Sequence, residues 1–419
     1  MYITVVQPGE SLAQVAARTR VAPASIVSLN GLRSEAVTTG QALLIQSNAY
    51  YVQAGDTLES ISQATGLSVQ QLERANVGAA RSLYQGRRLI LPRPQKLQGE
   101  GTAYMPITDP TVKVESLRSW EGALNWVPIF SYNVAADGTI EEPEDELALR
   151  NTWSINAAPL LCITNYGEGG VFNPQTARQL LTDTNFRTRA INTIVAKMKE
   201  KQYAGVDSDI EMVPEDLAAA YVTFLRELKA AMGAGKLLSA AIAPSYGDRT
   251  LAASLGHDYK GIGAVCDRVF LMNYDFNWVG GPPGPHITIN QERRVLQHAL
   301  NTIPDYKIIN GIETTAYNWT LPDTAENMAV PLSDDDAVAL AMQRRATITY
   351  DQEAEAPSFR YGDDQGQQHV VWFEDARSIL AKINLMRTLG VLNIGYWMAG
   401  HVNTQAIRLT NYFFTLPRA

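Results

Sequence analysis

The stretch Ala204-Gly205-Val206-Asp207-Ser208-Asp209-Ile210-Glu211 places three carboxylates at every second position. Successive side chains of a β-strand point to opposite faces, so Asp207, Asp209 and Glu211 would share one face of a strand. Like charges at this spacing disfavour one another's ionised forms, so such a face does not stabilise an ordinary strand. A solvated edge strand is the alternative, but apolar runs elsewhere indicate strands that are buried on both sides. The pattern therefore indicates a functional site on a buried strand.

Around this strand, apolar runs alternate with helical segments through the last three quarters of the chain. The runs predict strands at 103–106, 126–132, 159–164, 205–210, 237–244, 268–274, 307–312 and 393–398. Apolar residues at helical spacing predict helices at 174–182, 185–201, 214–232, 290–302 and 373–389. Eight strands that alternate with helices favour a (β/α)8 barrel over a doubly wound sheet. No glycine-rich nucleotide-binding motif follows any of these strands.

One segment, from about 323 to 369, interrupts the alternation between the seventh and eighth strands. It contains a predicted helix and short strand-like pieces at 347–350 and 358–361. We therefore expect a barrel domain over residues 96–419 that carries a small α+β insertion.

The first 95 residues contain an internal repeat with an offset of 46. Matched pairs include Gly9 with Gly55, Leu12 with Leu58, Asn30 with Asn76, and Gly40 with Gly86. Each unit has the pattern of a strand, two helices and a closing strand. Two small βααβ domains are therefore predicted, over residues 1–48 and 49–95.

These two units resemble LysM modules. The stretches VVQPGESLAQVAARTRVAPASIVSLNGL and YVQAGDTLESISQATGLSVQQLERAN carry that family's Gly-[Asp/Glu]-[Ser/Thr]-Leu motif and its late asparagine. The resemblance implies binding to glycans that contain N-acetylglucosamine (GlcNAc), either peptidoglycan or chitin. Small modules for protein contacts are the alternative. For Asn30 and Asn76 themselves we favour a structural role, because an asparagine after a helix is often a C-cap.

Composition and charge restrict the possible partners. The chain of 419 residues has a net charge of −8, with 46% hydrophobic and 19% charged residues, which is typical of a globular protein. Residues 1–95 carry 8 Lys+Arg and 5 Asp+Glu, a net of +3, and subtraction from the totals of 35 and 43 leaves −11 for the rest. Clustered basic residues are absent, so we expect no nucleic-acid partner. We also expect no signal peptide, transmembrane segment or membrane partner, because the chain contains neither a signal-peptide pattern nor an apolar stretch long enough to span a membrane.

The two cysteines, Cys162 and Cys266, each lie in an apolar strand-like run. We expect two buried thiols rather than a disulfide framework. No Cys-x-x-Cys or Cys/His ligand spacing occurs, so we expect neither a metal nor another cofactor.

Polar and aromatic residues gather where the predicted strands end, which is where barrel enzymes carry their chemistry. Glu211 closes the fourth strand, Tyr274 and Asp275 close the sixth, and Trp397 closes the eighth. Individually, Tyr274 and Trp397 could cap the core, and Asp275 could cap a turn. Their joint position favours one site on one rim.

These strand ends resemble those of family 18 glycoside hydrolases. Residues 204–211 are similar to the family's D-G-x-D-x-D-x-E strand, residues 272–275 to its M-x-Y-D strand, and Trp397 to its strand-eight tryptophan. The resemblance extends through residues 100–419. Closer still are the LysM-bearing spore-cortex enzymes of the SleL/YaaH type, which the chain resembles in LLCITNYGEGG, LMNYDFNWVGGPPGP, VVWFEDARSI and GYWMAG.

This resemblance implies a retaining hydrolysis in which the substrate's own acetamide acts as the nucleophile. Glu211 would be the general acid and would later activate water. Asp209 would orient the acetamide N–H, and Tyr274 would hydrogen-bond its carbonyl. Asp207 would lie deeper and could share a proton with Asp209. Asp209, roughly 6.6 Å from Glu211 along the strand, would raise the pKa of Glu211, and the three acids should titrate together.

The same resemblance implies the substrate-binding residues. Asp275 would hold sugar hydroxyls and Trp397 would pack against a sugar ring, with Asn165, Trp278 and Tyr396 as further substrate contacts. The family's first aspartate is replaced by Ala204, at the start of the strand, where we expect a structural effect.

The leading hypothesis is a β-N-acetylglucosaminidase that acts on peptidoglycan, with a spore location implied by resemblance alone. A chitinase and a non-catalytic glycan-binding or spore-coat protein are the alternatives. Endo or exo cleavage, a requirement for muramic-δ-lactam and the oligomeric state stay open, with a monomer as the simplest expectation.

Overall fold

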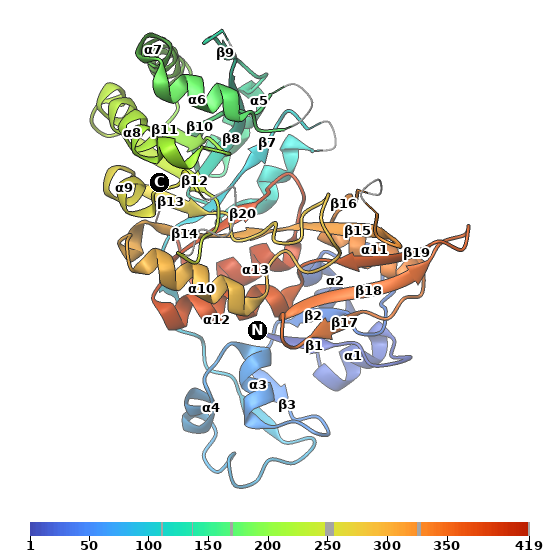
Figure 1. The fold of residues 1–419 in the computed structure, drawn as a ribbon. Helices are drawn as coiled ribbons and strands as arrows, with labels where there is room; N and C mark the ends of the chain where they lie inside the picture. Colours follow the sequence, from blue (N-terminus) through green and yellow to red (C-terminus); the bar gives the residue numbers. More distant parts are fainter. Residues whose placement is uncertain (110–111, 136, 168–170, 248–254, 325–327, 418–419) are drawn as a thin grey trace.

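The computed structural model describes all residues except 110–111, 136, 168–170, 248–254, 325–327 and 418–419. Its centre is a barrel of parallel strands, as the sequence predicts (Figure 1). In spatial order the strands are β8 (Trp126–Val134), β10 (Ala158–Thr164), β11 (Gly205–Asp209), β12 (Leu237–Ile242), β13 (Arg268–Leu271), β14 (Ile308–Glu313), β20 (Asn393–Trp397) and β6 (Gly101–Ala103). Pairing of β6 with β8 closes the barrel, and the short β7 (Met105–Pro106) extends the first strand along β8.

Helices surround the barrel and bury their apolar faces against it. They are η1 (Val114–Trp120), α5 (Glu146–Ser154), α6 (Pro174–Thr182), α7 (Thr184–Glu200), η2 (Glu215–Leu217), α8 (Ala218–Met232), α9 (Tyr259–Val265), α10 (Ile289–Leu300), η4 (Asp305–Lys307), α12 (Ala376–Leu389) and α13 (Thr404–Phe413). Short strands β5 (Leu97–Gln98), β9 (Ile140–Glu141) and β21 (Phe414–Thr415) lie at the periphery. Cys162 and Cys266 are buried free thiols, as expected. No helix in the described part of the chain is long and apolar enough to span a membrane.

The insertion is a five-stranded antiparallel sheet with one helix, and it is wider than the sequence predicts. Its strand order is β16 (Val330–Ser333), β15 (Thr315–Leu321), β19 (Gln368–Trp372), β18 (Ala356–Gly362) and β17 (Thr349–Asp351), and α11 (Asp334–Gln343) packs beside it. The expected bounds of 323 and 369 are therefore wrong. Strand β15 follows β14 after only Thr314, so no turn residues mark where the barrel strand ends and the insertion begins.

Both N-terminal units have the predicted βααβ order. In the first, β1 (Tyr2–Val5) pairs with β2 (Ala42–Ile45) around α1 (Leu12–Thr19) and α2 (Pro23–Asn30). In the second, β3 (Ala49–Tyr51) pairs with β4 (Arg88–Ile90) around α3 (Leu58–Thr65) and α4 (Val69–Ala75). The repeated asparagines are structural: Asn30 bonds the backbone of Leu44, and Asn76 bonds that of Ile90, so each ties a helix end to the closing strand.

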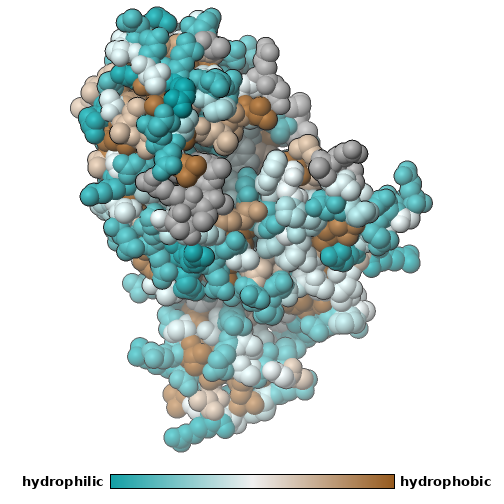
Figure 2. Space-filling model, viewed as in Figure 1, coloured by the Kyte–Doolittle hydropathy of each residue, from teal (hydrophilic) through white to brown (hydrophobic). Residues whose placement is uncertain are grey.

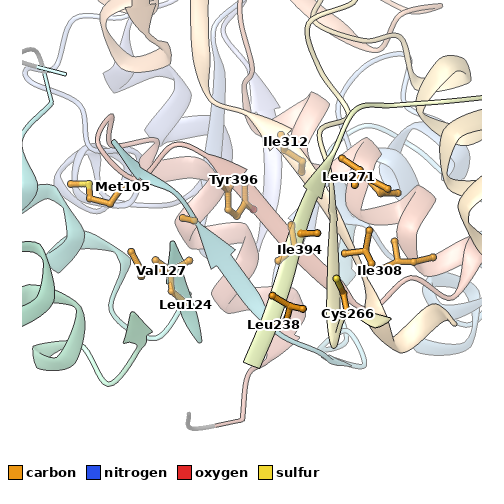
Figure 3. Packing of buried hydrophobic residues seen from close by; sticks show 14 of the residues in the cluster. Met105, Leu124, Val127, Leu238, Cys266, Leu271, Ile308, Ile312, Ile394 and Tyr396 are labelled. Atoms are coloured by element: carbon orange, nitrogen blue, oxygen red, sulfur yellow. The ribbon is translucent and has the colours of Figure 1, made fainter. Parts of the chain in front are cut away.

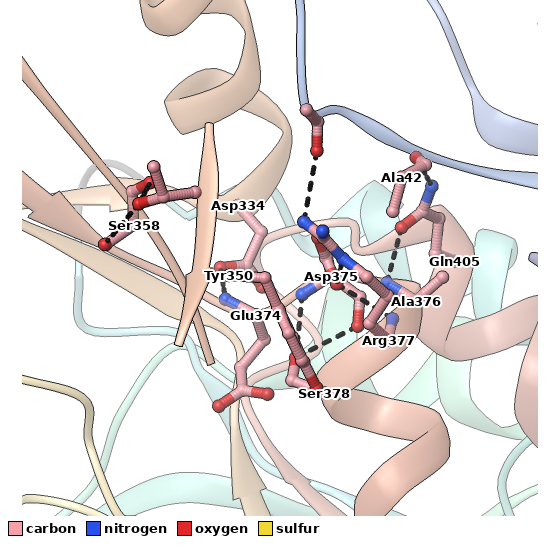
Figure 4. A network of polar contacts seen from close by, with 12 residues as sticks. Ala42, Asp334, Tyr350, Ser358, Glu374, Asp375, Ala376, Arg377, Ser378 and Gln405 are labelled. Carbon is pink, nitrogen blue, oxygen red and sulfur yellow. Dashed lines mark hydrogen bonds and ion pairs between the residues drawn. The ribbon is translucent and has the colours of Figure 1, made fainter. Parts of the chain in front are cut away.

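The first repeat is fixed to the barrel and to the insertion. Ile3 and Leu44 belong to the same hydrophobic core as the barrel. Polar contacts also join the first repeat to α12 and α13 of the barrel (Figure 4): Arg377 donates to the carbonyl of Gly40 at 3.2 Å, and Gln405 donates to that of Ala42 at 2.9 Å. The first repeat is therefore part of the body that carries the barrel, rather than a module on a flexible tether.

Glycines of two neighbouring strands make room for a large aromatic side chain inside the barrel. Phe270 of β13 is fully buried, and a Cβ atom at Gly311 or Gly395 would collide with its ring. Since β14 and β20 supply these two glycines, the interior near the site depends on the absence of their side chains.

We expect Gly395→Ala to lower the free energy of unfolding by about 1–3 kcal/mol, because the added methyl forces Phe270 out of its position. Chemical denaturation monitored by circular dichroism would measure it. Gly362→Ala is the control, since the nearest atom there is the flexible Gln368 amide at 3.1 Å. Equal unfolding midpoints for the two variants would contradict this packing.

Candidate active site

The predicted catalytic residues meet at the carboxyl ends of three barrel strands. Asp207 and Asp209 lie on β11 with Glu211 just beyond it, while Tyr274 follows β13 and Trp397 ends β20. Above them is a cavity of about 530 Å³, a size suited to a small ligand. Its lining residues are Tyr104, Phe130, Tyr166, Phe172, Asp209, Glu211, Ala241, Ala243, Pro244, Met272, Tyr274, Asp275, Phe276, Trp278 and Trp397.

Asp207 is the deepest of the three acids and does not line the cavity. Its side chain is fully buried and accepts hydrogen bonds from the Tyr104 hydroxyl at 2.7 Å and the Cys162 thiol at 3.6 Å. Burial raises its pKa, and the hydrogen bonds oppose that shift. Oδ1 of Asp207 and Oδ1 of Asp209 each have no hydrogen-bond partner among the described residues, so a proton shared between the two acids stays a prediction.

The carboxyl groups of Asp209 and Glu211 both favour the protonated form. Burial raises the pKa of Asp209 well above its usual range, and the charges of Glu211 and Asp207 raise it further. Burial raises the pKa of Glu211 to about 8, with a further contribution from the charge of Asp275. The expected like-charge effect on Glu211 is therefore present, but Asp275 across the cavity is the neighbour that supplies it.

Asn165 positions Glu211 and does not contact the cavity. Its side-chain oxygen accepts from the Glu211 backbone N–H at 2.9 Å, and its amide donates to the Glu211 carbonyl at 2.9 Å. Only 1% of Asn165 is exposed, so the prediction of a substrate contact is wrong. His257 supports the preceding residue: its Nδ1 accepts from Ala243 N–H, so its Nε2–H donates to the Ile210 carbonyl at 3.1 Å. No spacing pattern in the sequence predicts either role, because Asn165 follows β10 and His257 precedes α9, both far along the chain from Glu211.

Asp275 faces the cavity from a left-handed turn after β13, at φ 60°. Its side chain is 47% exposed to the cleft, yet the surrounding protein raises its pKa to about 6. The Tyr317 hydroxyl donates to it at 3.2 Å. Tyr317 comes from the insertion, which is why the strand-end pattern did not reveal it.

Two buried groups beside Asp275 were also missed. Ligand atoms of Asp275, His286 and Glu313 all lie within 4.8 Å of one another, a spacing that a divalent cation could use. His286 Nε2 lies 2.6 Å from the Thr315 carbonyl and therefore carries the proton, which leaves Nδ1 as an acceptor. Burial raises the pKa of Glu313 well above its usual range, so a proton also satisfies this group.

Of the three aromatic residues predicted to contact substrate, two line the cavity and one faces the core. Trp397 packs edge-on against Phe130 with ring centres 5.2 Å apart and lines the cavity, as does Trp278, which is 51% exposed. Tyr396 points the other way, into the core (Figure 3), where its hydroxyl bonds Thr410 at 2.7 Å. Its prediction as a substrate contact is wrong, because neighbouring residues of a strand face opposite sides and Trp397 occupies the inner one.

Comparison with known proteins agrees with this geometry. The family model for glycosyl hydrolases family 18 matches residues 169–401, and the LysM domain model matches residues 4–46 and 50–92. The cortical fragment-lytic enzyme of Bacillus anthracis is 34% identical over 426 aligned residues, which cover 99% of both chains. The crystal structure of the Bacillus cereus spore cortex-lytic enzyme SleL matches with a TM-score of 0.91 and 34% identity, covering 99% of this chain and 98% of that one. A chitinase from Chromobacterium violaceum, 24% identical with a TM-score of 0.67 over 75% of this chain and 98% of its own, shares the fold.

A parallel barrel with paired acids at a strand end, below an aromatic cavity, defines a glycosidase. The chain belongs to glycosyl hydrolase family 18 and carries two LysM domains at its N-terminal end.

We expect Glu211→Gln to stabilise the fold increasingly between about pH 4.5 and pH 8. The pKa of Glu211 rises from 4.5 to about 8 on folding. Its protonation therefore favours the folded state below 4.5, and this stability is lost as the pH rises through 8. The variant has no such loss, so the difference in unfolding free energy should reach the order of 1–3 kcal/mol at pH 8. Denaturant titrations at several pH values would measure it.

Glu144→Gln, at an exposed position, is the control for the loss of one carboxyl group. The same difference at every pH for Glu211→Gln would mean that Glu211 is ionised in the folded protein at neutral pH.

Proposed function

We propose that the chain hydrolyses β-1,4 N-acetylglucosaminyl bonds of peptidoglycan, in spore cortex or its fragments. The observation that carries this proposal is the pair Asp209, which is buried, and Glu211, which is half-buried, both lining an aromatic cavity at the end of β11. The names of the relatives support the substrate, since one is a cortical fragment-lytic enzyme and another a spore cortex-lytic enzyme. They also support a spore location.

Glu211 acts as the general acid. With a pKa of about 8, it holds its proton at neutral pH and can pass it to the glycosidic oxygen as the bond to the anomeric carbon breaks. The substrate's acetamide oxygen forms a bond to that carbon from the opposite face, which gives an oxazolinium ion. Glu211, now ionised, then takes a proton from the water that attacks the same carbon, and the bond from that carbon to the acetamide oxygen breaks. Two displacements retain the stereochemistry, and no second carboxylate needs to act as the nucleophile.

Asp209 and Tyr274 hold the acetamide for this attack. Asp209 accepts a hydrogen bond from the acetamide N–H, which increases the electron density on its oxygen, and the Tyr274 hydroxyl orients that oxygen. Both side chains line the cavity beside Glu211. Asp207, held by Tyr104 below them, is a positioning residue that fixes the electrostatic environment of Asp209.

The remaining cavity residues bind the sugar. Trp397 offers a ring face to the pyranose, Asp275 binds its hydroxyls, and Trp278 contacts a neighbouring unit. The LysM domains bind the same polymer and raise its local concentration near the cavity.

We expect Glu211→Gln to lower the rate of hydrolysis by at least about a hundredfold, because the amide cannot donate the catalytic proton. Mass spectrometry of products from spore-cortex fragments should show new GlcNAc reducing ends with the wild type only. Binding of the fragments should persist in the variant.

Glu144→Gln is the matched control and should cleave like the wild type. Cleavage of chitin oligomers but not of cortex fragments would favour a chitinase. Binding without any cleavage by the wild type would favour a non-catalytic glycan-binding protein, and near-normal cleavage by Glu211→Gln would refute the role of Glu211.

A further inference from the structure

The catalytic cavity opens into a second cavity that the proposed mechanism does not use. The second cavity has a volume of about 870 Å³ and shares Phe130, Tyr166 and Trp397 with the first. The two volumes together exceed the range that holds a single small ligand. A ligand that occupies both therefore extends well beyond one sugar ring.

The two cavities differ in chemistry. The catalytic cavity is lined mainly by aromatic and apolar side chains apart from its carboxyl groups. The second cavity, here called the charged cavity, is lined by Arg33, Asp335, Asp336 and His401 among other residues. Side chains of both signs in one cavity suit a ligand that carries both carboxylate and amino groups, whereas a neutral sugar polymer offers neither.

Three separate parts of the chain build the charged cavity. Arg33 follows α2 in the first repeat, Asp335 and Asp336 begin α11 of the insertion, and His401 follows the last barrel strand. Arg33 forms an ion pair with Asp336 at 2.6 Å, and the two side chains are 68% and 47% exposed. So exposed a pair adds little to the docking of the first repeat, and it leaves both groups accessible to a ligand.

Two of the other polar groups lack partners. Asp334 is committed to the fold, since it accepts from the Glu374 backbone N–H and the Asn403 amide. Asp335, the next residue, is half-buried and has no hydrogen bond with any described residue; burial raises its pKa to about 7, and the nearby charge of Arg33 opposes that shift. Nδ1 of His401 is buried without a hydrogen-bond partner in the described part of the chain. A buried polar group without a partner loses free energy that a ligand can restore.

We propose that the charged cavity binds the peptide substituents of a glycan strand whose sugars occupy the catalytic cavity. Arg33 would bind a peptide carboxylate, and Asp335 would bind an ammonium or amide N–H. The cleft would then select peptide-bearing strands over neutral GlcNAc polymers. This inference rests on the proposed function, because it takes the catalytic cavity as the sugar site.

The test compares two soluble substrates that differ only in the peptide: cortex glycan strands with their peptides, and the same strands after an amidase has removed them. We expect the wild type to have a several-fold higher kcat/KM on the peptide-bearing strands. Arg33→Gln and Asp335→Asn should each reduce this preference by about fivefold, mainly through KM. The preference should also fall as salt is raised, since salt screens exposed charges.

Arg344→Gln is the matched control. Arg344 forms an ion pair with Asp364 in the same insertion, where Asp364 is 90% exposed, and it does not line the charged cavity. This variant should keep the preference of the wild type. Equal rates on the two substrates, or equal losses on both in the Arg33 and Asp335 variants, would overturn the proposal.

A binding measurement separates this proposal from the proposed function. If the wild type cleaves neither substrate, the proposed function fails, but calorimetric titration of both strands into Glu211→Gln still tests the charged cavity. Tighter binding of peptide-bearing strands, reduced by adding Arg33→Gln to that variant, would support it. Equal affinities would overturn it independently of catalysis.

Discussion

The structure depends on the burial of carboxyl groups at the end of one barrel strand. Asp207 is fully buried and Asp209 is 3% exposed, so ionisation of either group would place a charge in surroundings that solvate it poorly. The same burial raises the pKa of Glu211 to about 8 and makes it an acid at neutral pH. This property has a thermodynamic cost, because a carboxyl group that stays protonated on folding opposes folding above its ordinary pKa.

The surrounding fold must offset that cost with rigid packing. Phe270 fills the interior between glycines of two adjacent strands, directly below the site. Asn165 holds the backbone of Glu211 through both of its side-chain polar atoms, and His257 holds the residue before it. These groups are themselves buried, so the acid is fixed by side chains that cannot easily move. Such support matters because a proton donor works only when it lies within hydrogen-bond reach of the bond it breaks.

The sequence predicted the parts of this protein that repeat with a simple period. Alternation located the strand of Asp207, Asp209 and Glu211, and the order of strands and helices predicted the barrel. Prediction from the sequence failed where a residue's role depends on a partner far along the chain. The resemblance implied that Asn165 contacts substrate, but both polar atoms of its side chain bond the backbone of Glu211. Tyr396 was wrongly predicted to contact substrate because it is next to Trp397 but faces the opposite side of the strand. Tyr317 was missed because no turn residues mark the start of the insertion that carries it.

The two repeats show how one sequence pattern can have different structural outcomes. Gly40 and Gly86 occupy equivalent positions, yet a Cβ atom at Gly40 would collide with the backbone of Ile348, whereas one at Gly86 would meet nothing within 4 Å. The repeated asparagines differ in the same way, since Gln405 of the barrel domain donates to Asn30. The first repeat is thus locked against the insertion and forms a wall of the charged cavity. Because that wall is fixed relative to Glu211, any substrate group it binds is held at a set distance from the acid, which a tethered module could not achieve.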